Sequence, residues 1–330
     1  MRTDWLAQVQ EDIIDPEQPI CDPHHHLWDH PDNPYLLPQL LSDVNSGHNV
    51  VSTVFVECSS MYRADGDAAF SPVGETEFVN GIAAMTASGD YGDFRACKGI
   101  VSYADLTLGA DVGPVLDEHM RHSDRFRGIR HAAGWDADER VRNSHTQPPE
   151  SLYRRDDFRA GFAQLAERRL SFDAWLYHPQ IPELTDLART FPEVTIIFDH
   201  FGGPLGIGPY EGQGDAIFAR WCEDAAALAA CPNVYPKLGG VVMPINGFGW
   251  HKRATPATSD EIVAATGRYH RKAIELFGPE RCMFESNFPV DQQSCSYHVL
   301  WNAFKKIAAD YAVADRQWLF HDAAAAAYRL

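Results

Sequence analysis

The sequence predicts a single (β/α)8 barrel with a C-terminal helix packed on the barrel. Short runs rich in β-branched residues alternate with amphipathic helical segments along almost the whole chain. These runs form eight strand-helix units in one unbroken series, which favours a closed parallel barrel over an open sheet. No glycine-rich nucleotide-binding fingerprint follows the first strand, and this argues against a doubly wound fold.

The length and composition are compatible with one domain over residues 1–330, because barrels of this kind reach such lengths. The formal net charge of −18 argues against nucleic acid and anionic membranes as partners, since both require basic patches. The N-terminus is polar and no apolar run is long enough to span a membrane, so we expect a cytoplasmic protein. The seven cysteines include no C-x-x-C pair and are expected to be reduced.

The elements follow in order from a weakly helical segment at residues 5–12. The first strand is predicted at residues 19–26, and the others at 49–58, 94–103, 126–132, 170–177, 194–200, 233–238 and 282–286. Helices are predicted at residues 75–86, 112–122, 156–169, 181–190, 215–230, 259–277 and 295–309. Residues 316–330 are predicted to form the helix that docks against the barrel wall, because their aromatic side chains need a partner surface.

The first strand carries the strongest candidate site, in the stretch ICDPHHHLWD at residues 20–29. Side chains alternate along a strand, so Asp22, His24 and His26 share one face. Two imidazoles side by side on a rigid element are what a metal ion or a polarised carbonyl oxygen needs. A surface cluster of histidines without function is the alternative interpretation.

Polar residues also end the later strands, where functional groups gather in this fold. His200 is the strongest of them, because a Gly-Gly-Pro turn follows it almost at once. We expect His24, His26 and His200 to converge at the barrel mouth, within roughly 10 Å between ring nitrogens. The other candidates are weaker: Glu57, Ser59, Arg130, His131, His178, Lys237 and Asn287. For Glu57, His178 and Lys237, a polar residue of the barrel rim without function is an open alternative.

Five segments resemble the amidohydrolase superfamily, in the branch that includes 2-pyrone-4,6-dicarboxylate lactonase and L-fuconolactonase. They are DPHHHLWD, FRGIRH, FDHFGGP, ESNFPVD and the closing YRL, and the resemblance runs from about residue 19 to residue 330. It implies a hydrolase of carboxylic esters, a lactonase that opens a small anionic lactone from sugar-acid or aromatic catabolism. It also implies a homodimer, by analogy with similar barrels.

The resemblance also implies roles for individual residues. His24, His26 and His200 would surround the reacting carbonyl or hold one divalent metal, zinc or manganese, which some members lack. Arg130 would bind the anionic group of the substrate. The remaining substrate contacts would come from Glu57, Ser59, His131, His178 and Lys237, with Arg130, His131 and Lys237 making the mouth electropositive.

Asn287 departs from the family pattern, in which an aspartate at this position activates water. An amide cannot act as a general base, although it can orient a water molecule or donate to an oxyanion. Asp291 is therefore the first candidate for the base, and Glu57 is the second. The loss of the aspartate leaves two alternatives open: a metal-dependent decarboxylase or other carbon-carbon bond enzyme of the same superfamily, and a non-catalytic binder of small molecules.

Overall fold

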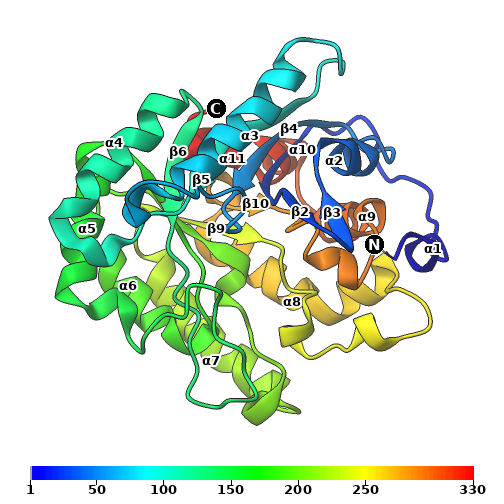
Figure 1. Cartoon of the computed structure of the whole chain (residues 1–330). Helices are drawn as coiled ribbons and strands as arrows, with labels where there is room; N and C mark the ends of the chain where they lie inside the picture. The colour runs from blue at the N-terminus through cyan, green and yellow to red at the C-terminus, as the bar shows by residue number, and fades with distance from the viewer. Residues whose placement is uncertain (1) are drawn as a thin grey trace.

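The computed structural model describes residues 2–330 and contains eight parallel strands in a nearly closed barrel (Figure 1). The barrel closes where the His26 amide donates to the Phe288 carbonyl at 2.8 Å and the Asn287 amide donates to the His24 carbonyl at 2.9 Å. The predicted fold is confirmed, and most strands end earlier than expected. Their order around the barrel follows the chain: β1 (Ile20–His25), β4 (Val50–Val56), β5 (Arg95–Ser102), β6 (Phe126–Arg130), β7 (Ser171–Ala174), β8 (Ile196–Phe198), β9 (Val234–Leu238) and β10 (Met283–Phe284).

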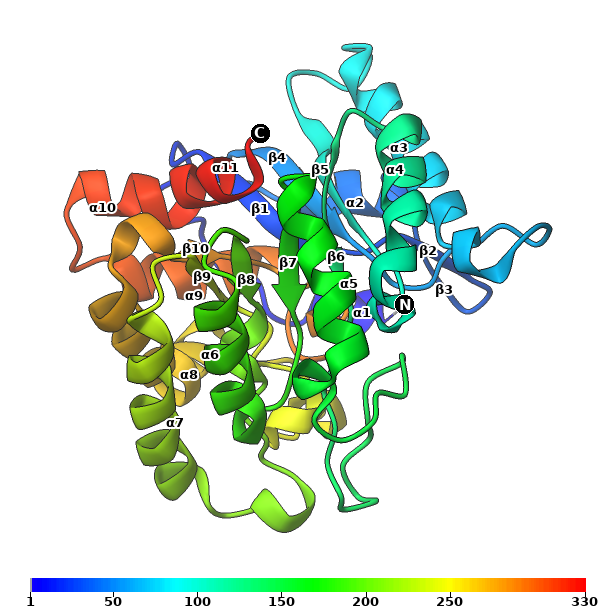
Figure 2. The ribbon, with the colours of Figure 1, turned by 90° about the vertical axis from the view of Figure 1, so that its left-hand side faces the viewer.

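Helices form the outer layer between successive strands (Figures 1 and 2). Local signals set their ends: the last long helix before β10 starts at a capping box of Thr258 and Glu261, and it ends before Gly278, whose φ is 81°. The outer helices are α3 (Val73–Ala87), α4 (Gly113–His122), α5 (Asp156–Glu167), α6 (Ile181–Thr190), α7 (Gly214–Ala229), α8 (Ser259–Phe277) and α9 (Tyr297–Ala308).

Three elements after β1 were not predicted. They are the small hairpin of β2 (Trp28–His30) and β3 (Asn33–Tyr35), and the helix α2 (Leu37–Val44). Closely spaced prolines in this segment indicate a loop, yet a proline in the first turn of α2 is compatible with a helix because that amide needs no partner. The N-terminal helix α1 (Thr3–Leu6) is shorter and begins earlier than predicted.

The C-terminal segment packs on the barrel as predicted, across the N-terminal ends of the strands (Figure 2). It consists of α10 (Val313–Gln317), a π-helical turn (Trp318–Asp322) and α11 (Ala323–Tyr328). Small alanine side chains let α11 approach the strands closely. Together with Tyr328 they pack on barrel residues Cys21, Val54, Val56, Val101, Ile197 and Met283. The C-terminal segment thus covers this end of the barrel. The polar residues lie at the opposite end.

The main hydrophobic core lies between the strands and the outer helices, and it contains most of the buried aromatic side chains. All seven cysteines are free thiols. Within residues 2–330, no helix combines the length and apolar character that crossing a membrane requires.

Candidate active site

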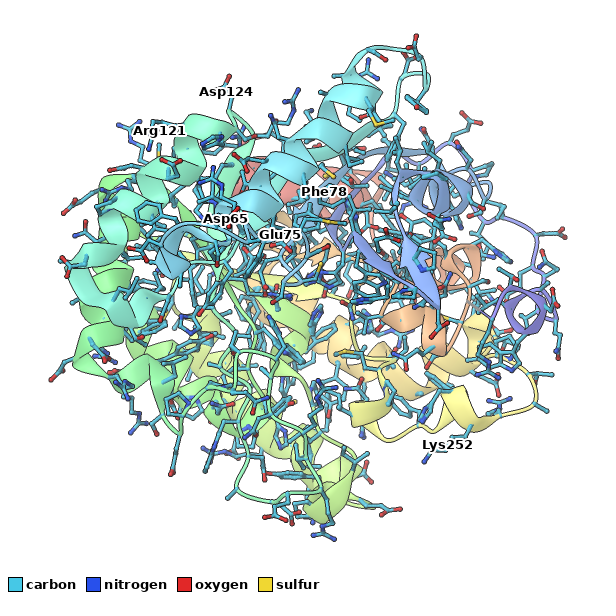
Figure 3. The ribbon with its side chains drawn as sticks, in the orientation of Figure 1. Asp65, Glu75, Phe78, Arg121, Asp124 and Lys252 are labelled. Carbon is cyan, nitrogen blue, oxygen red and sulfur yellow. The ribbon has the colours of Figure 1, made fainter. Side chains whose placement is uncertain are left out.

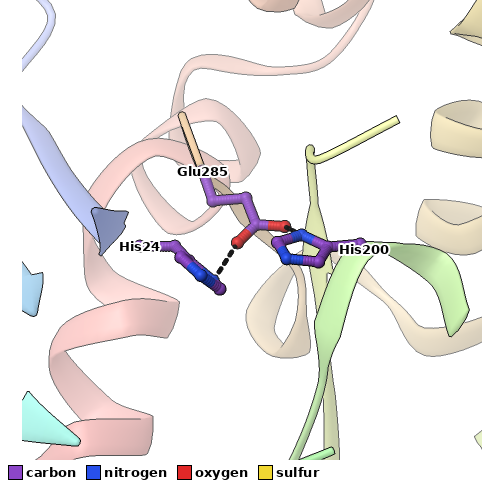
Figure 4. Close-up of side chains that lie close together, drawn as sticks. All are labelled: His24, His200 and Glu285. Carbon is purple, nitrogen blue, oxygen red and sulfur yellow. Dashed lines mark hydrogen bonds and ion pairs between the residues drawn. The ribbon is translucent and has the colours of Figure 1, made fainter. Parts of the chain in front are cut away.

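Three buried side chains from three strand ends meet at the barrel mouth (Figure 4). His24 lies at the end of β1, His200 follows β8, and Glu285 follows β10. Glu285 lies between the imidazoles, with Oε2 2.8 Å from His24 Nδ1 and Oε1 2.5 Å from His200 Nδ1. One ligand atom from each residue lies within 4.8 Å of the others.

His26 lies beside this group, and the predicted convergence of the three histidines is confirmed. The His24 ring centroid is 4.9 Å from that of His26 and 4.5 Å from that of His200. The Nδ1 atom of His26, however, lies 2.8 Å from the Val56 carbonyl oxygen, and the ring stacks on Trp28. His26 therefore contacts the neighbouring strand β4 through this hydrogen bond. The third member of the group is Glu285, where the sequence had predicted His26.

The backbone after β8 turns sharply to bring His200 into the mouth. His200 and Phe201 have φ values of 54° and 56°, and Gly202 and Gly203 also have positive φ. Gly240, after β9, gives the imidazole its space, because a Cβ atom at this position would lie 1.9 Å from His200 Nδ1. Trp175 packs against the same ring with a centroid separation of 4.9 Å.

Lys237 is fully buried next to His24, in the centre of the barrel. Its Nζ atom lies 2.7 Å from Asp173 Oδ2, 3.1 Å from Asp199 Oδ1 and 3.2 Å from His24 Nδ1. Asp173 Oδ2 also accepts a hydrogen bond from the Tyr328 hydroxyl at 2.6 Å. Burial would lower the pKa of Lys237, but the two aspartates outweigh it and raise the pKa, so the side chain stays charged.

Arg130 points its guanidinium at Glu57, and this pairing changes the role expected for both residues. Arg130 Nε donates to Glu57 Oε1 at 2.7 Å, and Nη2 donates to the Glu57 carbonyl at 2.6 Å. His145 Nε2 lies 3.1 Å from the second carboxylate oxygen. Burial would raise the pKa of Glu57, but Arg130 and His145 lower it to about 2. Glu57 is therefore a weak base. Because Nε and Nη2 of Arg130 donate to Glu57, the guanidinium cannot bind a substrate carboxylate through both of these nitrogens.

The charges around the group do not make the mouth electropositive as expected. Two cations, Arg130 and Lys237, face four buried carboxylates at close range: Glu57, Asp173, Asp199 and Glu285. Burial, before all other causes, lowers the pKa of His24 well below its usual value and that of His200 to about 3. Both rings are therefore neutral near pH 7, which is the form that binds metals.

The residues present fit a divalent metal. Glu285 Oε2 and both carboxylate oxygens of Asp199 are buried and accept no well-directed hydrogen bond from residues 2–330, and their close contacts are His24 Nδ1 at 2.8 Å from Glu285 Oε2 and Lys237 Nζ at 3.1 Å from Asp199 Oδ1. Two neutral imidazoles and a carboxylate form a donor set typical of catalytic zinc, which keeps its fourth position open, and the same donors suit manganese. The group able to hold a metal ion is thus His24, His200 and Glu285.

Asn287 and Asp291 form a second buried polar pair, in the loop after β10. Asn287 has a φ of 55°, and its Nδ2 donates to Asp291 Oδ1 at 2.9 Å. Asn287 Oδ1 and Asp291 Oδ2 are buried and accept no hydrogen bond from residues 2–330. Burial raises the pKa of Asp291 well above its usual range. The pair offers two unused acceptors, which a bound water molecule could satisfy.

The other predicted substrate contacts lie outside the central group. His131 Nδ1 accepts from the Leu106 amide and His178 Nδ1 accepts from the Leu205 amide, both at 3.3 Å. Burial lowers the pKa of each to about 4. Ser59 lies at the surface. The two histidines thus hold loops at the barrel rim, which is the alternative role left open for His178.

Sequence reasoning missed Glu285, Asp173 and His145. Glu285 and Asp173 each interrupt an apolar strand, and a carboxylate in such a run is a usable signal because it must find a partner when buried. His145 lies in the long loop between β6 and α5, where no periodic pattern marks it.

The sequence from residue 21 to residue 330 matches the family model described as Amidohydrolase. The chain therefore belongs to the amidohydrolase superfamily, in agreement with its barrel and with the histidines at the mouth.

Two curated relatives and one solved structure show how far the likeness extends. The chain is 36% identical to protein y4mH of Sinorhizobium fredii over 94% of this chain and 98% of that protein. It is 26% identical to L-fucono-1,5-lactonase of Burkholderia multivorans over 70% of this chain and 71% of that enzyme. An amidohydrolase from Burkholderia multivorans with bound zinc superposes with a TM-score of 0.72, at 22% identity over 94% of this chain and 99% of that one.

Proposed function

We propose that this protein is a hydrolase that opens a small anionic lactone. Two observations carry the proposal: the group of His24, His200 and Glu285, and the buried Asn287–Asp291 pair, in a loop at the same C-terminal end of the barrel, where the Asn287 amide donates to the His24 carbonyl at 2.9 Å. A group that can hold a metal next to a group that can hold water is what ester hydrolysis requires. The likeness to L-fucono-1,5-lactonase supports the same reaction class.

Under this proposal the residues at the barrel mouth have two roles in hydrolysis, binding of a metal ion and activation of water. His24, His200 and Glu285 would hold one divalent ion, which when bound supplies a Lewis acid for the lactone carbonyl. Asn287 Oδ1 and Asp291 Oδ2 accept the two O–H groups of the attacking water. Asp291 then takes the proton, since burial raises the pKa of its carboxyl group and makes the carboxylate a stronger base.

The remaining polar groups position the substrate. Of the Arg130 nitrogens, Nη1 is the one not held by Glu57, and it lies 3.4 Å from His24 Nε2. We assign it to a substrate oxygen beside the imidazole, in place of the bidentate carboxylate clamp expected from the sequence. The anionic group of the substrate would lie farther out, toward the partly exposed His145.

A substrate screen tests the proposal. Purified protein, after metal analysis, is mixed with sugar-acid and muconate-type lactones in a weak buffer that contains a pH indicator. Lactone opening releases a proton and no gas, so acidification without carbon dioxide is the expected result. Carbon dioxide release from an aromatic acid would instead support the decarboxylase alternative, and saturable binding without turnover would support a non-catalytic binder.

A further inference from the structure

A polar cavity lies at the opposite end of the barrel from the candidate active site. Its volume is about 280 Å³, and it is formed by the end of α4, the start of β6, the end of α5 and the C-terminal segment. We call it the arginine cavity, because four of its lining residues are arginines. The lining consists of Met120, Ser123, Asp124, Phe126, Arg127, Arg168, Arg169, Leu170 and Arg329. Figure 3 labels Asp124 at this end of the molecule.

Three of the four guanidinium groups form no ion pair with a carboxylate of the described residues. Arg168 pairs with Asp117 at 2.7 Å, but Arg127, Arg169 and Arg329 make no ion pair within residues 2–330. Arg127 donates to the carbonyls of Asp124 and Arg329 at 2.6 and 3.2 Å, and Arg329 donates to the Arg127 carbonyl at 3.3 Å. Asp124 is the one acidic residue of the lining, and its charge acts to raise the pKa of Arg127, so a single carboxylate faces three guanidinium groups that make no ion pair.

The like charges lie close enough to oppose one another. Burial, and then the Arg329 guanidinium, lower the pKa of Arg127. Burial, and then the Arg169 guanidinium, lower the pKa of Arg329. In a chain with a net charge of −18, a concave site with three clustered cations is a local exception to the overall charge. An anion in this site would relieve the repulsion and would bind through charge-assisted hydrogen bonds.

We propose that the arginine cavity binds a phosphate dianion, either free or as the phosphomonoester of a small metabolite. Guanidinium groups match phosphate oxygens in pairs, and three of them can surround a tetrahedral ion. The cavity holds roughly nine water volumes, which is more than one phosphate fills. Met120, Phe126 and Leu170 supply an apolar wall for the organic part of a monoester.

A bound phosphate would join parts of the chain that are distant in sequence. Arg329 directly follows α11, which covers this end of the barrel, whereas Arg127 is the second residue of β6 and Arg169 follows α5. Binding to the folded state alone raises stability by mass action. The ligand would thus fasten the C-terminal segment to the barrel, far from the chemistry.

Thermal unfolding and calorimetric titration at constant ionic strength test the site. The probes are inorganic phosphate and glycerol phosphate, with sodium chloride as the ionic control. Arg169→Gln is the informative variant, because this exposed side chain makes no hydrogen bond that the fold needs, and Arg329→Gln is the second. Arg154→Gln is the matched control, since it makes the same charge change at an exposed site before α5.

We expect a saturable rise of Tm with phosphate for the wild type and for Arg154→Gln. Both cavity variants should bind phosphate about 10-fold more weakly or worse, as expected for loss of a charged hydrogen bond. Tighter binding of glycerol phosphate than of phosphate would identify a monoester as the ligand, and equal binding would identify the free ion. Absence of a rise beyond that in chloride, or an equal rise in the cavity variants, would overturn the proposal.

Discussion

Asn287 and Asp291 are the residues on which the proposed chemistry depends most. The amide holds one oxygen of Asp291 and leaves the other free, and burial raises the pKa of the carboxyl group. We expect Asp291→Asn to lower kcat by about 10²-fold or more, the usual range for loss of a general base. Steady-state kinetics on the lactone found in the screen measure this, with the exposed Asp310→Asn as the matched control.

Replacement of Asn287 distinguishes two mechanisms. Asn287→Asp restores the residue usual in the family and should be tolerated or raise hydrolysis. If instead Asn287→Ala abolished turnover while Asp291→Asn left kcat unchanged, the amide itself would be the essential group. The chemistry would then be stabilisation of an oxyanion, and a histidine would have to act as the base.

Asp43 provides a pH-dependent contribution to stability away from the site. Its Oδ2 accepts from the Tyr35 hydroxyl at 2.7 Å, and burial, more than the nearby Asp22, raises its pKa to about 7. The folded state therefore binds more protons than the unfolded state between about pH 4 and pH 7. Its free energy of unfolding falls as pH rises through this window, by at most about 4 kcal/mol.

Asp43→Asn should remove this pH dependence while it keeps an acceptor for Tyr35. Urea unfolding at pH 4.5, 6 and 7.5 measures the effect. The advantage of the variant over the wild type should grow with pH, since the wild type alone must ionise a half-buried carboxyl group. Parallel stability curves for the two proteins would contradict the assignment.

At the scale of elements, the turns after β8 and β9 decide the position of His200. A Cβ atom on Gly240 would collide with His200 Nδ1, and the φ of Gly240 is +64°. Gly240→Ala should therefore displace the imidazole, with loss of the metal ion that we propose for the site and of most turnover. The matched control is Gly249→Ala, because Gly249 has a φ of +68° and no atom within 4 Å of the added Cβ.

Zinc content and kcat of the two variants separate the effects. Both carry the strain of an alanine at positive φ, roughly 1–2 kcal/mol of stability. Only Gly240→Ala should change the site. Equal zinc content and equal kcat in both variants would show that His200 can move without consequence.

At the scale of the whole molecule, the C-terminal segment connects the closed end of the barrel with its charged centre. Tyr328 packs beneath the strands and donates to Asp173, which in turn binds Lys237. Tyr328→Phe should lower the free energy of unfolding by about 1.5–3 kcal/mol, as for loss of a hydrogen bond to a charged group. Urea unfolding measures this change. The matched control is Tyr91→Phe at an exposed position, which should change the free energy of unfolding by less than about 0.5 kcal/mol.

The order of strands and helices could be predicted from the sequence because alternation and helical periodicity are local properties. The same holds for the histidines of β1 and for His200, which sit in short motifs at strand ends. The hairpin of β2 and β3 and the helix α2 could not be predicted, because prolines hide the periodicity there. The substrate, the homodimer and the cytoplasmic location stay predictions, since each depends on molecules outside this chain.

The sequence by itself determined the barrel, its closed series of parallel strands and the two strand ends that supply imidazoles. The tertiary structure alone decided which charges become partners. Glu285 joins the histidines in place of His26, and Arg130 is held by Glu57. Lys237 lies between the carboxylates of Asp173 in β7 and Asp199 directly after β8. The physical reason is that a buried charge takes its counter-charge from neighbouring strands, and that neighbourhood exists only once the barrel has closed.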